Sequence, residues 1–491
     1  MEYLLEGCQP AAVWHYFEEI SAIPRRSGQE RAVSEYLCRF AASHGLEHWR
    51  DEWNNVVIKK AGSKGCETQP AVMLQGHQDM VCEKNADVVH DFETDGISLE
   101  IRGGYLCAKG TTLGADNGIA VAMMLAVLVD GSLIHPPLEC VFTVQEEVGL
   151  IGAANLDVSR LSAKTMINLD SEEEGIATVS CAGGLRAELS RRVPAEPAKE
   201  AYGCRITLGG LPGGHSGTDI GAGRTNANKL MGRILNHLLL KTEFRLARLS
   251  GGSKDNAIPR ECEALLVFAG KENREAAFDC LQEYADMLKR ELLPGEPGFF
   301  CRWEAADPEE TAADAEETRG LVQLLTLAPN GVQSRNVRQG GFIVSSVNLG
   351  VVRLEGGEAR LVFAPRSSVA SLQEEMKERL LALGRAFGYS VVFAGEYPGW
   401  EYAEHSPVRA LCCRVYRELT DKELKTEAIH AGLECGLFCQ KLPGLDAIAI
   451  GPNMLDVHTP EERLEIASVT RTYALVCRLL EALAKEEKQK R

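Results

Sequence analysis

Imidazole and carboxylate side chains at five separate places along this chain are of the types that bind divalent metals and move protons. Five of them are candidate metal ligands and two are candidate proton carriers: His77, Asp116, Glu147, Asp170 and His458, with Asp79 and Glu146. A hydrolase needs such a set, because paired cations activate water and polarise a carbonyl while a nearby carboxylate transfers the proton. The sequence therefore predicts a two-metal hydrolytic site.

The adjacent pair Glu146 and Glu147 directly follows an apolar run that ends at Val144. Neighbouring carboxylates repel each other, so burying both at a strand end is costly unless cations or a shared proton compensate. We assign Glu147 to a metal and Glu146 to the proton, because an activated water needs a general base nearby. A charged surface turn is the alternative interpretation.

Four further candidates lie where a predicted strand ends or a predicted helix begins. His77 and Asp79 follow a strand, at the edge where open α/β sheets bind ligands, and Asp79 could orient His77 or the catalytic water. A polar loop is the alternative. Asp116 precedes a helix, where a lone aspartate is usually an N-cap. Asp170 ends another strand, and the glutamates at 172–174 are expected to form a solvated rim.

His458 has no partner ligand nearby in the sequence. Thr459, Pro460 and Glu462 after it resemble a helix start, with Thr459 as the N-cap and Glu462 completing a capping box. We expect that helix to fix His458 at the edge of the site.

Composition indicates a folded, soluble protein of more than one domain. The chain has 491 residues, of which 45% are hydrophobic and 25% charged, and its net charge is −17. That charge disfavours nucleic-acid and anionic membrane partners. Its 16 dispersed cysteines suit a reducing compartment. No signal peptide is visible, and the longest apolar run, residues 119–129, is too short to span a bilayer, so we expect a cytoplasmic protein.

Apolar runs alternating with helical patterns at both ends of the chain predict an α/β fold, with a mixed, mostly parallel sheet and helices on both faces. The expected strands are residues 55–59, 71–75, 138–144, 165–169 and 446–450, and the expected helices are residues 13–20, 31–44, 118–128, 407–419 and 435–440, with a last one from residue 460.

The pattern between these stretches is different. Alternating segments, Gly-rich turns and long amphipathic helices predict an inserted α+β domain at residues 186–399. Residues 400–491 are then expected to fold back and complete one catalytic domain with residues 1–185. Similar apolar segments at 266–269 and 361–364 each precede a helical stretch, so an internally duplicated α+β unit is one interpretation of the insertion.

Taken together, the motifs resemble the co-catalytic zinc peptidases related to carnosinases, aminoacylases and carboxypeptidase-type exopeptidases. The resemblance covers essentially the whole chain and is carried by six segments: Gly76-His-Gln-Asp-Met-Val81, Gly110-Thr-Thr-Leu-Gly-Ala-Asp-Asn-Gly118, Glu146-Glu-Val-Gly149, Asn168-Leu-Asp170, Gly213-Gly-His-Ser-Gly217 and His458-Thr-Pro460. It implies a catalytic domain interrupted by a lid domain.

The resemblance also implies a role for each candidate in a site with two divalent metal ions. It assigns Asp116 as the bridge between them, His77 and Asp170 to one metal, and Glu147 and His458 to the other. Glu146 is the implied general base and Asp79 supports it. Zinc is the expected metal, and cobalt or manganese are alternatives because such N and O ligands accept all three.

Three residues of the inserted domain are implied to contact substrate. His215 would stabilise the oxyanion, Arg366 would accept a peptide carboxylate through its planar guanidinium, and Asn256 would be a further contact. A plain Gly-rich loop, turn or surface residue is the alternative for each. His430 and Glu434 receive no role, because both could be structural.

The expected function is metal-dependent hydrolysis of unblocked dipeptides with broad specificity, aminoacyl-histidines included. A metal-bridged water would attack the carbonyl, and Glu146 would pass its proton to the leaving amine. The alternatives are an N-acyl amino-acid deacylase or other short-peptide exopeptidase on the same scaffold, and a catalytically inactive metal- or peptide-binding protein. A small peptide is the expected partner, and a homodimer through the lid domain is an alternative to an enlarged lid that replaces the partner.

Overall fold

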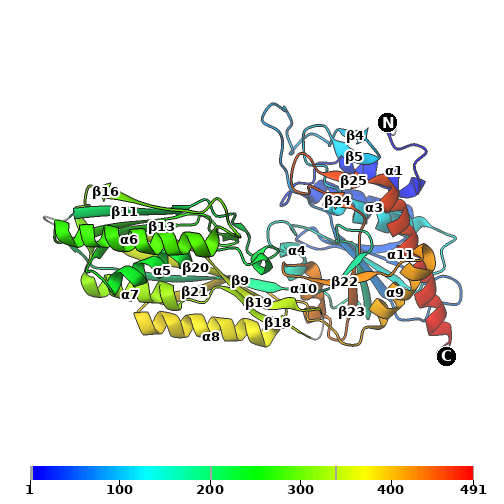
Figure 1. The fold of residues 1–491 in the computed structure, drawn as a ribbon. Coiled ribbons are helices and arrows are strands. Elements are labelled where there is room, and N and C mark those ends of the chain that lie inside the picture. Colours follow the sequence, from blue (N-terminus) through cyan, green and yellow to red (C-terminus); the bar gives the residue numbers. More distant parts are fainter. Residues whose placement is uncertain (1–3, 199–201, 338–339, 490–491) are drawn as a thin grey trace. The chain divides into compact units, whose positions relative to one another are not determined.

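The chain folds into two compact units, drawn in Figure 1. The computed structural model describes residues 4–198, 202–337 and 340–489. The first unit comprises Met1–Ser180, Tyr402–Ala428 and Leu433–Arg491, and the second comprises Cys181–Glu401 and Ile429–Gly432. The four residues 429–432 lie within the segment expected to complete the first domain, yet they pack with the second unit.

The first unit contains a mixed eight-stranded sheet in the order β1-β2-β6-β3-β7-β23-β8-β22. Its strands are β1 (Glu47–Arg50), β2 (Val56–Lys60), β3 (Val72–His77), β6 (Leu138–Thr143), β7 (Thr165–Asn168), β8 (Ile176–Cys181), β22 (Lys425–Ile429) and β23 (Asp446–Ala449). The central strands β6, β3, β7 and β23 are parallel neighbours. The expected α/β fold is thereby confirmed.

Helices cover this sheet: α1 (Ala11–Ser21), α2 (Arg31–Ser43), α3 (Ala115–Val129), α4 (Ile151–Asn155), α9 (Pro407–Thr420), α10 (Glu434–Lys441) and α11 (Ile466–Gln489). Five of them, α1, α2, α3, α9 and α11, share one apolar core with the sheet. Every residue of β3 and β6 is buried, as expected for central parallel strands. None of the described helices combines the length and the apolar character needed to cross a membrane.

The last helix begins at Ile466, so the prediction of a helix start at Pro460 is wrong. The preceding residues instead form β24 (Met454–Leu455) and β25 (Arg463–Glu465), which join β5 (Tyr105–Ala108) and β4 (Leu99–Arg102) in a small sheet. The backbone N–H and C=O groups of residues 463–465 form their hydrogen bonds with β5, so they do not need the hydrogen bonds of a helical turn. The expected capping box is absent, because the Glu462 carboxylate contacts residues 113–116 instead.

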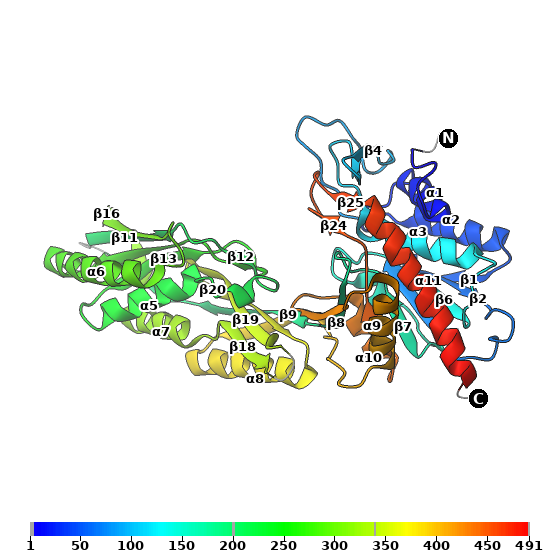
Figure 2. The same ribbon diagram turned by 45° about the vertical axis from the view of Figure 1, so that its right-hand side comes forward.

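The second unit is built on a nine-stranded sheet whose main path runs β16-β11-β15-β13-β19-β20-β9-β21, with β18 also paired to β19. The strands are β9 (Gly183–Arg192), β11 (Tyr202–Gly209), β13 (Arg245–Gly251), β15 (Cys262–Phe268), β16 (Phe300–Ala306), β18 (Gly331–Asn336), β19 (Phe342–Glu355), β20 (Glu358–Ser367) and β21 (Ser390–Tyr397). Its long helices, α5 (Ala227–Leu239), α6 (Lys271–Leu292), α7 (Ala315–Leu327) and α8 (Ala370–Phe387), share a second core with the sheet (Figure 2).

The two halves of this sheet repeat one order of elements. The series β11, α5, β13, β15, α6, β16 is matched by β9, α7, β19, β20, α8, β21. The pairing order is also the same from each edge inward, and β13 meets β19 at the centre. The similar segments at 266–269 and 361–364 fall at β15 and β20, which hold equivalent places.

The first and last residues of segment 181–401 of the inserted unit lie close together in space. Cys181 and Trp400 form an antiparallel bridge in which each backbone N–H donates to the other's carbonyl, at 3.1 and 2.9 Å. The main part of the insertion, residues 181–401, therefore begins and ends at one hydrogen-bonded pair, and residues 429–432 join the same unit separately.

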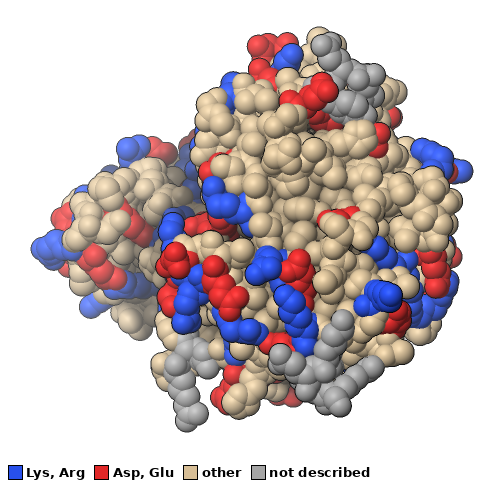
Figure 3. Space-filling view, turned by 90° about the vertical axis from the view of Figure 1, so that its right-hand side faces the viewer, with Lys and Arg blue, Asp and Glu red and all other residues tan. Residues whose placement is uncertain are grey.

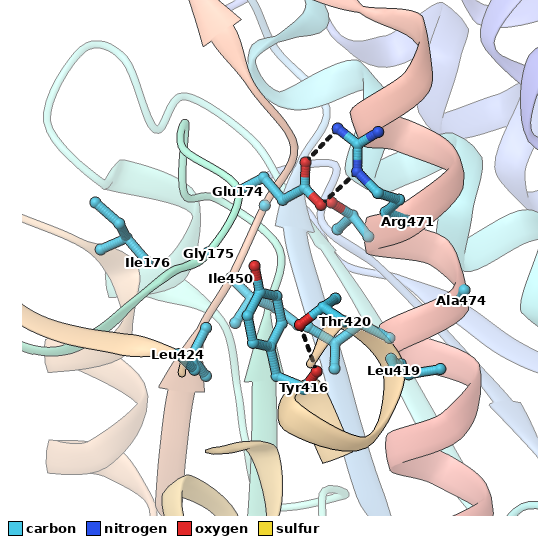
Figure 4. Close-up of a pocket in the computed structure, with 13 residues that line it drawn as sticks. Glu174, Gly175, Ile176, Tyr416, Leu419, Thr420, Leu424, Ile450, Arg471 and Ala474 are labelled. Atoms are coloured by element: carbon cyan, nitrogen blue, oxygen red, sulfur yellow. Dashed lines mark hydrogen bonds and ion pairs between the residues drawn. The ribbon is translucent and has the colours of Figure 1, made fainter. Parts of the chain in front are cut away.

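A small cavity of about 120 Å³ lies in the first unit between α9, α11 and the start of β8 (Figure 4). The Glu174 carboxylate and the Arg471 guanidinium pair beside it, with Arg471 Nε 2.6 Å from a carboxylate oxygen. Glu174 is thus paired, whereas its neighbours Glu172 and Glu173 are exposed as expected of a rim. On the face of the first unit in Figure 3, basic side chains lie beside acidic ones rather than in a patch of their own.

Candidate metal centre

The candidate ligands gather because three neighbouring strands are parallel. His77 is the last residue of β3, and Asp170 follows β7 by two residues. Glu147 follows β6, and Asp116 lies in the first turn of α3. Since β6, β3 and β7 run side by side in one direction, their carboxyl ends meet at one edge of the sheet, where such sheets bind ligands.

Asp116 lies between two histidines. His77 Nε2 is 3.1 Å from Asp116 Oδ1 and 3.5 Å from Asp170 Oδ1. On the other side, His458 Nε2 is 3.1 Å from Asp116 Oδ2 and 3.0 Å from Glu147 Oε1. The two oxygens of one carboxylate therefore face two different ligand groups.

Each group has the donors of a divalent metal site. In both triads, His77–Asp116–Asp170 and Asp116–Glu147–His458, one ligand atom per residue lies within 4.8 Å of the others. A third set, His77 with Glu146 and Glu147, meets the same limit. Imidazole nitrogens and carboxylate oxygens suit zinc, cobalt and manganese. The donor set thus fits two divalent cations that share Asp116.

Acidic groups are crowded at this edge. Burial raises the pKa of Glu146 well above its usual range, and the neighbouring carboxylates of Asp170, Glu434 and Glu147 raise it further. Burial also raises the pKa of Asp170 to about 6. Buried like charges are costly without compensating positive charge, which two cations would supply.

Asp79 is fully buried and contacts two parts of the site. Its backbone oxygen lies 3.2 Å and its carboxylate 3.4 Å from His77 Nδ1. The same carboxylate accepts the backbone N–H groups of Glu146 and Glu147, at 3.1 and 3.3 Å, and the Ser27 hydroxyl at 2.8 Å. Engaging Nδ1 leaves His77 Nε2 directed at the metal position.

A buried polar network that the sequence analysis missed lies under the ligands. Glu434 accepts hydrogen bonds from the Thr143 hydroxyl at 2.6 Å and from the Gln75 side-chain amide. The Gln75 carbonyl accepts from the Asn168 amide at 2.6 Å, and Asn168 accepts the Asp170 N–H at 3.1 Å. Burial raises the pKa of Glu434 to about 8. The sequence signal for this network was the presence of polar residues, such as Gln75 and Asn168, within otherwise apolar strands.

The three candidate substrate residues belong to the second unit. His215, in β12 (Gly214–His215), is half-buried, and its backbone N–H donates to Asp219 Oδ2 at 2.8 Å. Burial, followed by the charge of Arg366, lowers the pKa of His215. This histidine is therefore neutral at physiological pH and lies within electrostatic reach of Arg366.

Arg366 and Asn256 line one open pocket of about 310 Å³ within the second unit. Arg366 Nη1 donates to the Tyr397 hydroxyl at 2.8 Å, and Tyr397 also lines the pocket. Arg186 lines it as well, but is paired with Glu188 at 2.9 Å. Tyr397 was missed by the sequence analysis, because a tyrosine in an alternating strand carries no distinct signal.

His430 is a buried neutral group of the second unit. Its Nε2 is 2.7 Å from the Ser346 hydroxyl. Burial lowers the pKa of His430 to about 4, and the charges of Arg366 and Arg335 contribute. The imidazole is therefore uncharged when the protein is folded at neutral pH.

Comparison with known proteins agrees with this geometry. Residues 73–482 match the model of the peptidase family M20/M25/M40. The cytosol non-specific dipeptidase of Escherichia coli K12 is 36% identical over 480 residues, which are 98% of this chain and 99% of that protein.

A solved structure and a more distant relative are also similar. The crystal structure of aminoacylhistidine dipeptidase from Vibrio alginolyticus superposes with a TM-score of 0.92 at 35% identity, over 97% of this chain and 98% of that one. Acetylornithine deacetylase from Myxococcus xanthus is 25% identical over 296 residues, which are 57% of this chain and 70% of that protein.

Proposed function

The chain belongs to the peptidase family M20/M25/M40, and we propose that it hydrolyses unblocked dipeptides of broad sequence, aminoacyl-histidines among them. The observation that carries the proposal is the position of Asp116, whose two oxygens face His77 and His458 at 3.1 Å each. Similarity over nearly the whole chain to two dipeptidases supports the substrate class.

The proposed site holds two divalent cations, with zinc as the expected metal. His77 and Asp170 would bind one, Glu147 and His458 the other, and Asp116 both. When bound, such cations polarise a substrate carbonyl and lower the pKa of water.

Glu146 is the proposed general base. Its backbone N–H donates to Asp79 at 3.1 Å, so the residue is fixed to the loop that directly follows His77. Its carboxylate would take a proton from water and return it to the leaving amine. Glu147 is the proposed metal ligand, so of these two adjacent glutamates one would bind metal and the other would transfer the proton.

The second unit is proposed to bind the carboxyl end of the peptide and the oxygen of the carbonyl that is attacked. Arg366 would hold the substrate carboxylate, with Asn256 as a further contact in the same pocket. His215 would donate a hydrogen bond to the developing oxyanion, for which a neutral imidazole is suited. We also propose a cytoplasmic location, and association of two chains through the second unit stays a prediction.

The test is a substrate panel assayed before and after chelation. Free dipeptides, including an aminoacyl-histidine, are compared with N-acetylated amino acids and with N-acetylated dipeptides. We expect turnover of free dipeptides only, its loss after chelation, and its recovery when zinc, cobalt or manganese is added back. Turnover confined to N-acetylated amino acids would identify a deacylase instead. Absence of turnover with metal bound would identify a binding protein.

A further inference from the structure

The loop that carries Asp116 is held by two buried charged side chains from distant parts of the chain. Glu462 and Arg25 are each 2% exposed, and neither belongs to the ligand set. A buried charge is costly unless it is paired and hydrogen-bonded. The hydrogen bonds of these two side chains therefore show which part of the structure they stabilise.

Glu462 accepts hydrogen bonds from four successive backbone N–H groups. One carboxylate oxygen accepts from Leu113 at 2.7 Å and Gly114 at 2.9 Å, and the other accepts from Ala115 at 2.8 Å and Asp116 at 3.4 Å. These N–H groups belong to the loop that leads into the regular part of α3, because the backbone of Asp116 and Asn117 is not helical. Buried N–H groups need acceptors, and Gly114 before the helix has no side chain to supply one, so Glu462 supplies the acceptors from elsewhere.

Arg25 holds the same loop through carbonyl groups. Its Nη1 donates to the carbonyls of Gln78 at 3.1 Å and Asp79 at 3.2 Å, and its Nη2 donates to the Gly114 carbonyl. One guanidinium thus ties the loop after β3 to the loop before α3. Arg25 and Glu462 are also close enough that the carboxylate opposes the lowering of the Arg25 pKa caused by burial.

Two glycines of the Gly114–Gly118 motif make room for this guanidinium. A Cβ atom added at Gly114 would lie 2.5 Å from Arg25 Nη2, and one added at Gly118 would lie 2.6 Å from it. Gly114 also has a φ of 67°, which side chains disfavour. The glycines at these two positions are thus explained by the approach of Arg25.

Glu462 reaches the loop because of strand pairing. Arg463 pairs with Cys107 where β25 joins β5, so residue 462 comes beside the segment that leads from β5 to α3. The same glutamate lies four residues after His458 along the chain. It therefore connects the loop of one histidine ligand to the loop of the bridging aspartate.

We propose that Glu462 and Arg25 are positioning residues, which set the place of Asp116 between His77 and His458 before any metal binds. The inference rests on the proposed two-metal site and extends it, because neither residue is a proposed ligand or substrate contact. A ligand set held in place in advance binds metal more tightly than one that must be ordered on binding.

The test compares Glu462→Gln with Glu461→Gln, a neighbouring change of the same charge at an exposed side chain. Two measurements are made without substrate: amide hydrogen exchange in the metal-free protein, and zinc affinity by titration. We expect E462Q to exchange faster at residues 113–116 only and to bind zinc about 10- to 100-fold more weakly, the usual cost of losing a group that supports metal ligands. E461Q should match the parent protein in both.

Arg25→Lys is the second variant, because one ammonium cannot span the three carbonyls that a guanidinium reaches. It should weaken zinc binding and speed exchange in the same loop. Unchanged exchange and zinc affinity in E462Q would overturn the proposal, and so would unfolding of its whole first unit, which would indicate a purely structural role. Neither measurement uses a peptide, so a negative substrate panel would contradict the dipeptidase function without affecting this test.

Discussion

The two units place their polar side chains by different means. In the first, parallel neighbours β6, β3 and β7 deliver ligands to one sheet edge, and buried charges such as Arg25 and Glu462 hold the loops. In the second, the described pairs of the nine-stranded sheet are antiparallel, and Arg366 and His430 contact neutral hydroxyls.

This difference explains why the metal ligands of the first unit could be predicted from the sequence. Parallel strands all end at the same edge, so chain order alone says which residues converge. Antiparallel strands end alternately at opposite edges, and convergence then depends on register and on turns. The metal site of the first unit is accordingly expected to depend on its crowded buried charges, and the pocket of the second unit on strand register and on the guanidinium of Arg366.

The largest expected effect concerns the adjacent glutamates of the first unit. Glu146→Gln should lower kcat about 10²- to 10⁴-fold, the usual contribution of a general base, while both metals still bind. Glu147→Gln should instead weaken one of the two metal sites. Steady-state kinetics and metal content measured on both variants check this, and a fully metallated E146Q with normal kcat would contradict the division of roles.

An intermediate effect is expected at the pocket of the second unit. Arg366→Met should raise KM for dipeptides about 10- to 100-fold, which corresponds to losing a charge-assisted hydrogen bond. The matched control is Arg186→Met, which changes an arginine of the same pocket that is paired with Glu188. The difference should vanish for C-terminally amidated dipeptides. An equal loss on amidated substrates would show that Arg366 does not bind the carboxylate.

The smallest expected effect is an acid sensitivity of the second unit. The His430 pKa is about 4 in the folded protein, below its value in the unfolded chain. At any pH between these two pKa values, the unfolded chain binds more protons than the folded protein. Stability should therefore fall as pH drops, by about 1 kcal/mol between about pH 7 and pH 5.5. Urea unfolding of the parent and of His430→Gln at both pH values measures it, and an equal pH slope in the two proteins would contradict it.

The strand ends and most element bounds could be predicted because apolar periodicity and strand order determine them. The places of Glu147 and Asp170 followed from that order, whereas Asp116 was placed only before a helix, and its role as a ligand came from the resemblance. The helix start at Pro460 was wrong, since local capping signals cannot show that β25 pairs with β5. Glu462 was misread for the same reason.

The supporting residues could not be predicted, because their partners lie far away in sequence and, for Arg25 and Glu462, are backbone groups. Arg25 donates only to carbonyls, and Glu434 depends on polar residues of two different strands. Backbone groups carry no residue identity that a sequence pattern could reveal. The assignment of residues 429–432 to the second unit is likewise a matter of packing that no periodicity encodes.

The hydrogen-bonded bridge between Cys181 and Trp400 brings together the two ends of residues 181–401, the main part of the inserted unit. A short linker in place of these residues would therefore close the chain at little cost in loop entropy. A different domain grafted at this junction would also have to pack against residues 429–432, but the strand ends that hold the ligands would stay unchanged. The same metal chemistry could in this way acquire new substrates by exchange of a whole module, without any change to the ligands themselves.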